Sequence, residues 1–230
     1  MKHPRKHIIC DSIQELKPIL KKWCDLNREY TEKTKSDCSW WYGERAAISI
    51  LAAAVWKSGN IALEEYSTDK RGDEFSASVK GRCDLKIVIG DKKFLFEAKQ
   101  IRPRLSKKKE YDALSKPCEG ILNKLISACR GAGRLKSREG MRFGICFVSP
   151  RISESEADHL GERIDKLINL LLEKSRKYHA IAWYFANNWD DLKEKKNIYP
   201  GVILLIREVK KFKPKKSGQS RRSRKSRVLR

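Results

Sequence analysis

Two carboxylates that could bind a divalent cation, Asp84 and Glu97, occur close in sequence to an ammonium group, Lys99. Between the two acids, Gly90-Asp91 separates two runs rich in Ile, Val and Phe, a pattern typical of a β-hairpin with a tight turn. With those two residues as the whole loop, we expect Asp84 to lie directly opposite Glu97. Opposed carboxylates repel unless a cation lies between them, and oxygen ligands suit Mg²⁺ or Mn²⁺.

Alternation along the two strands divides their side chains between two faces. The face predicted to meet the core is entirely apolar: Leu85, Ile87, Ile89, Phe94, Phe96 and Ala98. The other face, predicted to point away from the main core, carries Asp84, Lys86, Val88, Leu95, Glu97 and Lys99. The alternative is an ordinary surface hairpin whose acids form exposed ion pairs with Lys99, which contribute little to stability.

The spacing of these residues resembles the PD-(D/E)xK nuclease superfamily: Asp84, twelve intervening residues, then Glu97-Ala98-Lys99. The resemblance implies that Asp84 and Glu97 bind one or two divalent metals, with the Ala98 carbonyl as a further ligand. It implies that Lys99 stabilises charge near the scissile phosphate or orients the attacking water. It further implies Mg²⁺ as the cofactor, with Mn²⁺ able to substitute, and DNA as the substrate.

Neighbouring residues extend this resemblance over about residues 40–150. Gln100 matches a residue that follows the lysine in several branches of the superfamily, which makes it an accessory candidate. Cys83 stands where the superfamily often has proline, a common departure.

A helix predicted over residues 40–57 places Glu44 on the same stripe as Ala47, Ile48, Leu51 and Val55. A carboxylate on an apolar stripe is costly unless it is paired or bound to a metal. In the superfamily a Glu on the helix before the sheet completes the acidic site, so the resemblance makes Glu44 a catalytic and metal-ligand candidate. The alternatives are stabilisation by the helix N-terminus and a pair with Arg45 or another base.

Composition points to a polyanionic partner. The 230 residues have a formal net charge of +23, and 40% of them are hydrophobic, enough for a core. DNA is the expected partner; RNA stays open, and no apolar run is long enough to span a bilayer. Seven cysteines without a CxxC pair argue against a disulfide framework, so we expect a cytoplasmic, nucleic-acid-associated protein that is not secreted.

Basic residues concentrate in two connections and at the C-terminus. Residues 210–230 contain eleven Lys or Arg and no acid, so we expect a disordered tail that contacts phosphates; a solubility tail or a nuclear-import signal is the alternative. The candidate nucleic-acid-binding residues are Arg102, Arg104, Lys107, Lys108, Arg130, Arg134, Arg221, Arg222, Arg224 and Lys225.

The expected fold class is α/β, with a restriction-endonuclease-like core in which helices flank a central mixed β-sheet. The core order should be helix, three strands, helix (118–132) and strand (142–149), followed by a helix (153–177) and two strands (180–186 and 202–206). The expected organisation is an N-terminal helical extension (1–39), a nuclease-like domain (40–208) and the basic tail (209–230). The N-terminal helix, 11–30, contains Pro18 and should kink there.

Together these patterns predict a metal-dependent nuclease that hydrolyses phosphodiester bonds in DNA, as an endonuclease rather than an exonuclease. Two alternatives remain: a non-catalytic nucleic-acid-binding protein on the same fold, and an RNA-directed nuclease. The oligomeric state is open, a homodimer included. Absence of the P-loop, GxSxG and HExxH patterns argues against nucleotide hydrolysis, serine-hydrolase and zinc-protease chemistry.

Overall fold

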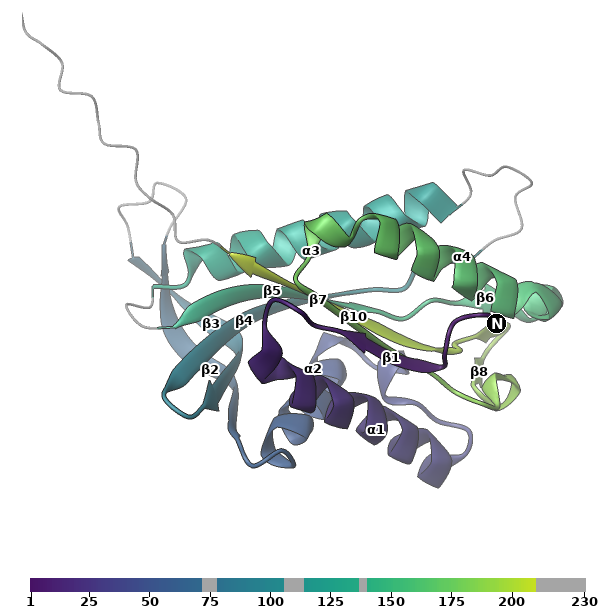
Figure 1. Cartoon of the computed structure of the whole chain (residues 1–230), viewed down its shortest axis with the longest axis horizontal. Helices are drawn as coiled ribbons and strands as arrows, with labels where there is room; N and C mark the ends of the chain where they lie inside the picture. The colour runs from purple at the N-terminus through teal and green to yellow at the C-terminus, as the bar shows by residue number, and fades with distance from the viewer. Residues whose placement is uncertain (72–77, 106–113, 137–139, 210–230) are drawn as a thin grey trace, which may run out of the picture.

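Runs of Ile, Val, Leu and Phe form a seven-stranded mixed sheet at the centre of the protein (Figure 1). This computed structural model describes residues 1–71, 78–105, 114–136 and 140–209. The strand order is β1-β7-β10-β5-β4-β3-β2; β4 and β5 are parallel, and every other neighbouring pair is antiparallel. The strands are β1 (Lys6–Ile9), β2 (Ile61–Arg71), β3 (Ser78–Ile89), β4 (Lys92–Ile101), β5 (Met141–Val148), β7 (Ala180–Phe185) and β10 (Gly201–Val209).

Two helical layers cover the sheet. Helices α1 (Lys17–Thr34) and α2 (Glu44–Trp56) pack on one face, and α3 (Ser115–Arg134) and α4 (Leu160–Glu173) pack on the other (Figure 1). A small second sheet orders β6 (Ile152–Ser153), β9 (Asn197–Ile198) and β8 (Lys193–Glu194). No helix in the part of the chain that the structure describes is long and apolar enough to cross a membrane.

The predicted α/β class and the order helix, three strands, helix, strand are present as α2, β2, β3, β4, α3 and β5.

Two N-terminal details differ from expectation. Pro18 lies in the first turn of α1. Backbone N–H groups there make no hydrogen bond within the helix, so the proline does not disturb it and the predicted kink is wrong. Residues 6–9, for which no strand was predicted, form β1 and pair with β7 at the edge of the sheet.

The helix predicted over 153–177 is shorter than expected. Residues Glu154–His159 form a 3₁₀ helix, α4 begins at Leu160, and no side-chain hydrogen bond caps either start. The 3₁₀ segment leads the chain from β6 to the outer surface of the sheet before the amphipathic stripe of α4 begins.

Beyond the sheet, β2 and β3 continue as a two-stranded arm, residues 66–71 and 78–83. Pairing of β3 with β4 stops at Leu85, whereas its pairing with β2 continues to Ser78. The arm reaches the C-terminal end of α3, because the Lys136 N–H donates to the Asp69 carbonyl at 2.9 Å and Arg134 Nε donates to the Arg71 carbonyl at 3.0 Å. The polar residues 67–71 are therefore part of β2.

Candidate metal centre

A local irregularity of β3 shapes the site. The hairpin pairs Ile89 with Lys92, as predicted, and pairing ends at Leu85–Phe96, one step before Asp84 would meet Glu97. On the other side of β3, the ladder with β2 omits the step that would join Asp84 to Glu65. Glu65 has a φ of 46°, which non-glycine residues rarely adopt.

Asp84 uses the resulting space to reach the backbone of β4. Its Oδ2 accepts the Ala98 N–H at 2.7 Å. Cys83 and Leu85 are two positions apart and would share a face of a regular strand. Instead, Cys83 packs with Leu95 and Leu135, whereas Leu85 joins the core under α1 and α2. The regular alternation predicted for β3 therefore does not continue through Asp84.

The apolar face of the hairpin is confirmed as a core face. The second face points away from that core, as predicted, but it is not exposed, because Leu95 and Glu97 are buried beneath the end of α3. A β-carbon on Gly131 of α3 would lie 3.1 Å from Glu97 Oε2, so the helix approaches this carboxylate closely.

Glu97 is a buried acid, 7% exposed. Its Oε1 lies 2.7 Å from Lys70 Nζ, and the two groups form an ion pair. Burial raises the pKa of Glu97, the positive charge of Lys70 opposes that rise, and the negative charge of Asp84 adds to it. The two predicted ligand carboxylates are thus close enough to repel each other.

Lys70 was not among the predicted site residues. It comes from the arm, and its aliphatic stem crosses Gly81, where a β-carbon would lie only 2.8 Å from Lys70 Cδ. The missing side chain at Gly81 is what leaves room for the ammonium to reach Glu97. A glycine inside a strand, which can mark a close approach of another group, was the available sequence signal.

Lys99 and Glu44 meet at the more exposed side of the same site. Lys99 Nζ donates to the Ala98 carbonyl at 2.6 Å and lies 3.4 Å from Glu44 Oε1. Glu44 is the first residue of α2. Burial raises the pKa of Glu44, Lys99 opposes the rise, and the charge of Asp84 adds to it. Arg45 pairs instead with Glu65 at 2.7 Å, so the base that pairs with Glu44 is Lys99 and not Arg45.

The accessory candidates beside the site hold backbone in place. Gln100 Nε2 donates to the Trp40 carbonyl and to Ser149 Oγ, both at 3.1 Å. Arg102 donates to the carbonyls of Trp41 and Tyr42, the latter at 2.6 Å. Both side chains therefore fix the segment that leads into α2 and position Glu44.

The remaining basic candidates do not join this site. Arg104 forms a backbone bridge with Arg151, while Arg130 and Arg134 lie on α3 beside a separate groove. Lys107, Lys108, Arg221, Arg222, Arg224 and Lys225 lie outside the described residues.

The donor atoms are of the kind that Mg²⁺ prefers, carboxylate and carbonyl oxygens from Asp84, Glu97, Ala98 and Glu44. Glu97 Oε1 is buried without a hydrogen bond. Within the described ranges, however, no three His, Cys, Asp or Glu side chains gather closely enough to hold a metal ion. The ammonium groups of Lys70 and Lys99 now neutralise the oxygens that a metal would contact, so a metal could bind only if they moved.

Comparison of this chain with protein-family models, with curated proteins and with solved structures found no match.

Proposed function

We propose that this protein is a metal-dependent nuclease that hydrolyses phosphodiester bonds in DNA, on a restriction-endonuclease-like core. The observation that carries the proposal is the burial of Glu97 near Asp84, with Glu44 and Lys99 on the exposed side of the same site, where β3 and β4 separate. They come from two strands and one helix, and an ordinary surface hairpin would have no reason to bury Glu97 there.

The sheet order supports the same proposal. An antiparallel triplet, β2-β3-β4, is followed through α3 by β5, which lies parallel to β4. This is the helix, three strands, helix, strand order that the resemblance implied, and both acids of the motif lie on its central strands.

Each side chain has a role that its position supports. Asp84, Glu97 and Glu44, with the Ala98 carbonyl, would hold the ion. When bound, Mg²⁺ supplies positive charge to the phosphate and lowers the pKa of a bound water. Lys99 places a compact ammonium at the exposed side, where it can face a nonbridging phosphate oxygen or hold the attacking water.

The direct test compares the wild-type protein with the single variants Asp84→Ala, Glu97→Ala and Lys99→Ala. The measurement is the rate at which each cleaves supercoiled plasmid DNA in Mg²⁺ or in EDTA. Each substitution should lower the rate by about 10²–10³-fold or more, because charge stabilisation of the transition state is lost. Glu162→Ala and Lys166→Ala are matched controls, since that exposed pair lies on α4 and should leave the rate unchanged. Wild-type rates in all three site variants would overturn the proposal.

A second candidate, nucleic-acid binding without cleavage, is favoured by one observation. Lys70 and Lys99 already balance the charges of Glu97 and Glu44 without a metal. This candidate expects no Mg²⁺-dependent cleavage of DNA or RNA by the wild-type protein, together with binding that EDTA does not weaken.

A further inference from the structure

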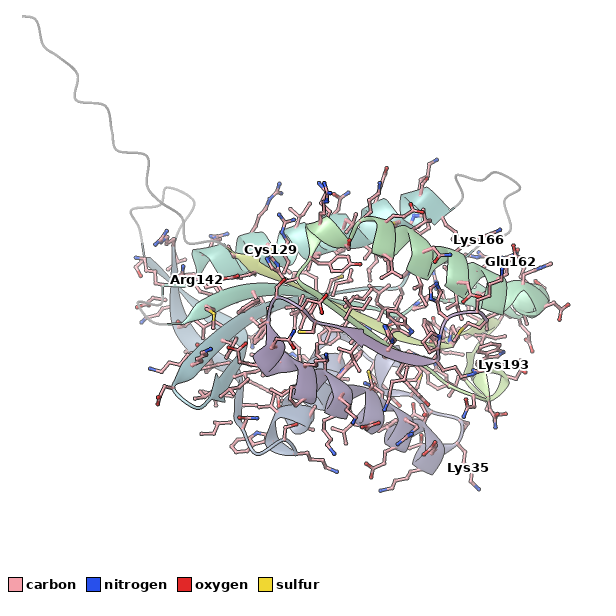
Figure 2. All side chains as sticks on the ribbon, viewed as in Figure 1. Lys35, Cys129, Arg142, Glu162, Lys166 and Lys193 are labelled. Carbon is pink, nitrogen blue, oxygen red and sulfur yellow. The ribbon has the colours of Figure 1, made fainter. Side chains whose placement is uncertain are left out.

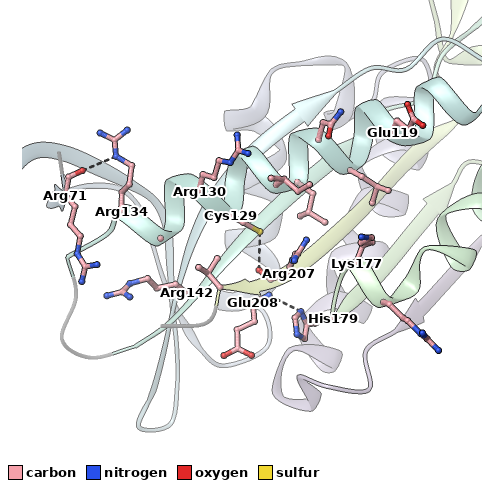
Figure 3. Close-up of a pocket in the computed structure, with 17 residues that line it drawn as sticks. Arg71, Glu119, Cys129, Arg130, Arg134, Arg142, Lys177, His179, Arg207 and Glu208 are labelled. Atoms are coloured by element: carbon pink, nitrogen blue, oxygen red, sulfur yellow. Dashed lines mark hydrogen bonds between the residues drawn. The ribbon is translucent and has the colours of Figure 1, made fainter. Parts of the chain in front are cut away.

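A groove of about 1350 Å³ lies between α3 and the end of β10 (Figure 3). We call it the basic groove. Arg130 and Arg134 line it from α3, Arg207 lines it from β10, and Arg176 and Lys177 line it from the 3₁₀ turn that follows α4.

Charge in the basic groove is strongly one-sided. Among the described residues that line it, seven are Arg or Lys and two, Glu119 and Glu208, are acidic. Burial lowers the pKa of Arg142 at one end of the groove, and the positive charge of Arg71 lowers it further, so like charges face one another there.

This arrangement differs from the charged surface at the other end of the protein. Figure 2 places Glu162, Lys166 and Lys193 far from Cys129 and Arg142. There, Lys166 pairs with Glu162 at 2.6 Å and Lys193 with Glu154 at 2.7 Å. Positive charge in the basic groove is therefore a local surplus and not only a consequence of a basic chain.

The basic groove is separate from the candidate metal centre. Gly131 of α3 faces Glu97, whereas its neighbour Arg130 lines the groove together with Cys129 and Gly133. Successive residues of a helix point in different directions, so the two sites lie on different flanks of α3.

We infer that the basic groove binds the phosphate backbone of a nucleic acid outside the place where the strand is cut. Guanidinium groups suit phosphate because they donate paired hydrogen bonds. An open groove with cations on both walls can neutralise several successive phosphates without reading a base. The inference shares the nucleic-acid partner of the proposed function but does not depend on metal binding or cleavage.

The test measures binding in EDTA, where cleavage cannot contribute. The double variant Arg130→Glu with Lys177→Glu reverses two exposed charges on opposite walls of the groove. Fluorescence anisotropy with a labelled DNA duplex of about 30 base pairs measures the affinity. We expect the affinity to fall at least about tenfold at low salt. The logarithm of the association constant falls linearly with the logarithm of the salt concentration. The magnitude of this slope should decrease by about two, since each lost phosphate contact removes about 0.9.

A matched double variant, Lys17→Glu with Lys21→Glu, changes the net charge equally on α1, across the sheet from the groove. It should keep most of the affinity and the salt slope. The neutral pair Arg130→Gln with Lys177→Gln should show an intermediate loss, and circular dichroism should show that all variants are folded.

Equal losses in the groove and α1 variants would overturn the inference, because only net charge would then matter. Retention of duplex binding by the groove variant, or loss only of binding to anionic lipid vesicles, would overturn it as well. Loss of binding in the groove variant, with no cleavage by the wild-type protein, would sink the nuclease proposal and leave the groove assignment standing.

Discussion

On one flank of α3, Glu97 lies buried beneath Gly131 and meets the ammonium of Lys70; on the other, Arg130 and Lys177 line an open groove with few acids. Buried charge must be balanced inside the protein, because burial of an unpaired ion costs several kcal/mol. Surface charge is hydrated and can remain in surplus until a partner supplies the opposite sign. The difference separates a site suited to chemistry from a surface suited to long-range attraction.

Both regions depend on the close approach of α3 to the sheet. A β-carbon on Gly144 of β5 would lie 2.4 Å from the Cys129 backbone nitrogen, which cannot move without shifting the helix. Gly144→Ala should therefore cost about 3 kcal/mol of unfolding free energy, or roughly 6–12 °C in Tm.

The control for this substitution is Gly133→Ala on the same helix. The nearest contact of the added carbon would be Val209 Cγ1 at 3.7 Å, an ordinary packing distance. Because alanine favours helix over glycine, Tm should stay equal or rise slightly. Equal melting of the Gly144→Ala variant and the wild type would show that α3 can move away from both sites at little cost.

Removal of the Lys70 charge should separate the two regions. Lys70→Met keeps the stem over Gly81 but leaves Glu97 without its cation, at an expected cost of about 2 kcal/mol in EDTA at pH 8. If Glu97 binds Mg²⁺, the ion should restore more of the Tm in this variant than it adds to the wild type, because the competing ammonium is gone.

Thermal melts with Mg²⁺ or EDTA measure this difference, and Lys80→Met is the matched control. Lys80 belongs to the same arm, but its pair with Asp69 at 3.0 Å is exposed. Its loss should change neither Tm nor the response to Mg²⁺. An identical Mg²⁺ response in Lys70→Met and the wild type would contradict metal binding at Glu97.

A smaller effect concerns pH. The pKa of Glu97 is raised in the folded protein, chiefly by burial, so its contribution to stability is complete below its unfolded pKa of about 4.3 and is lost as pH rises through the folded value. Glu97→Gln removes this loss. The Tm of Glu97→Gln relative to the wild type should therefore be higher at pH 8 than at pH 4.

Glu162→Gln gives the opposite sign in the same measurement. A hydrogen bond from Lys166 lowers the pKa of Glu162, so the wild type gains stability as pH rises above the folded pKa of this group and the variant does not. A pH-independent difference between Glu97→Gln and the wild type would mean that Glu97 is not a strained acid.

Local pattern was sufficient for the hairpin and for the helix that carries Glu44. Gly90-Asp91 defines the turn, and alternation defines the core face of Leu85 and Phe94, because both depend on residues close in sequence. The partnership of Lys70 with Glu97 could not be predicted in this way, since it depends on how the arm curves over the end of α3.

The basic groove was beyond sequence pattern for a similar reason. Arg130 was predicted as a phosphate contact from its place near the end of a helix, but Arg176 and Arg207 join it only after α4 and β10 pack beside α3. Likewise, β1 pairs with β7 across more than 170 residues, and its short segment has no alternation strong enough to indicate a strand.

The left-handed residue Glu65 has an effect beyond the room that it leaves for Asp84. β2 is an edge strand of the sheet, with Ile61 and Leu63 exposed, and edge strands can recruit a strand from another molecule. Because Glu65 interrupts the regular backbone of β2, an incoming straight strand can match only the residues on one side of it. The distortion that lets Asp84 reach the backbone of β4 thus also makes this edge of the sheet a poor template for an added strand.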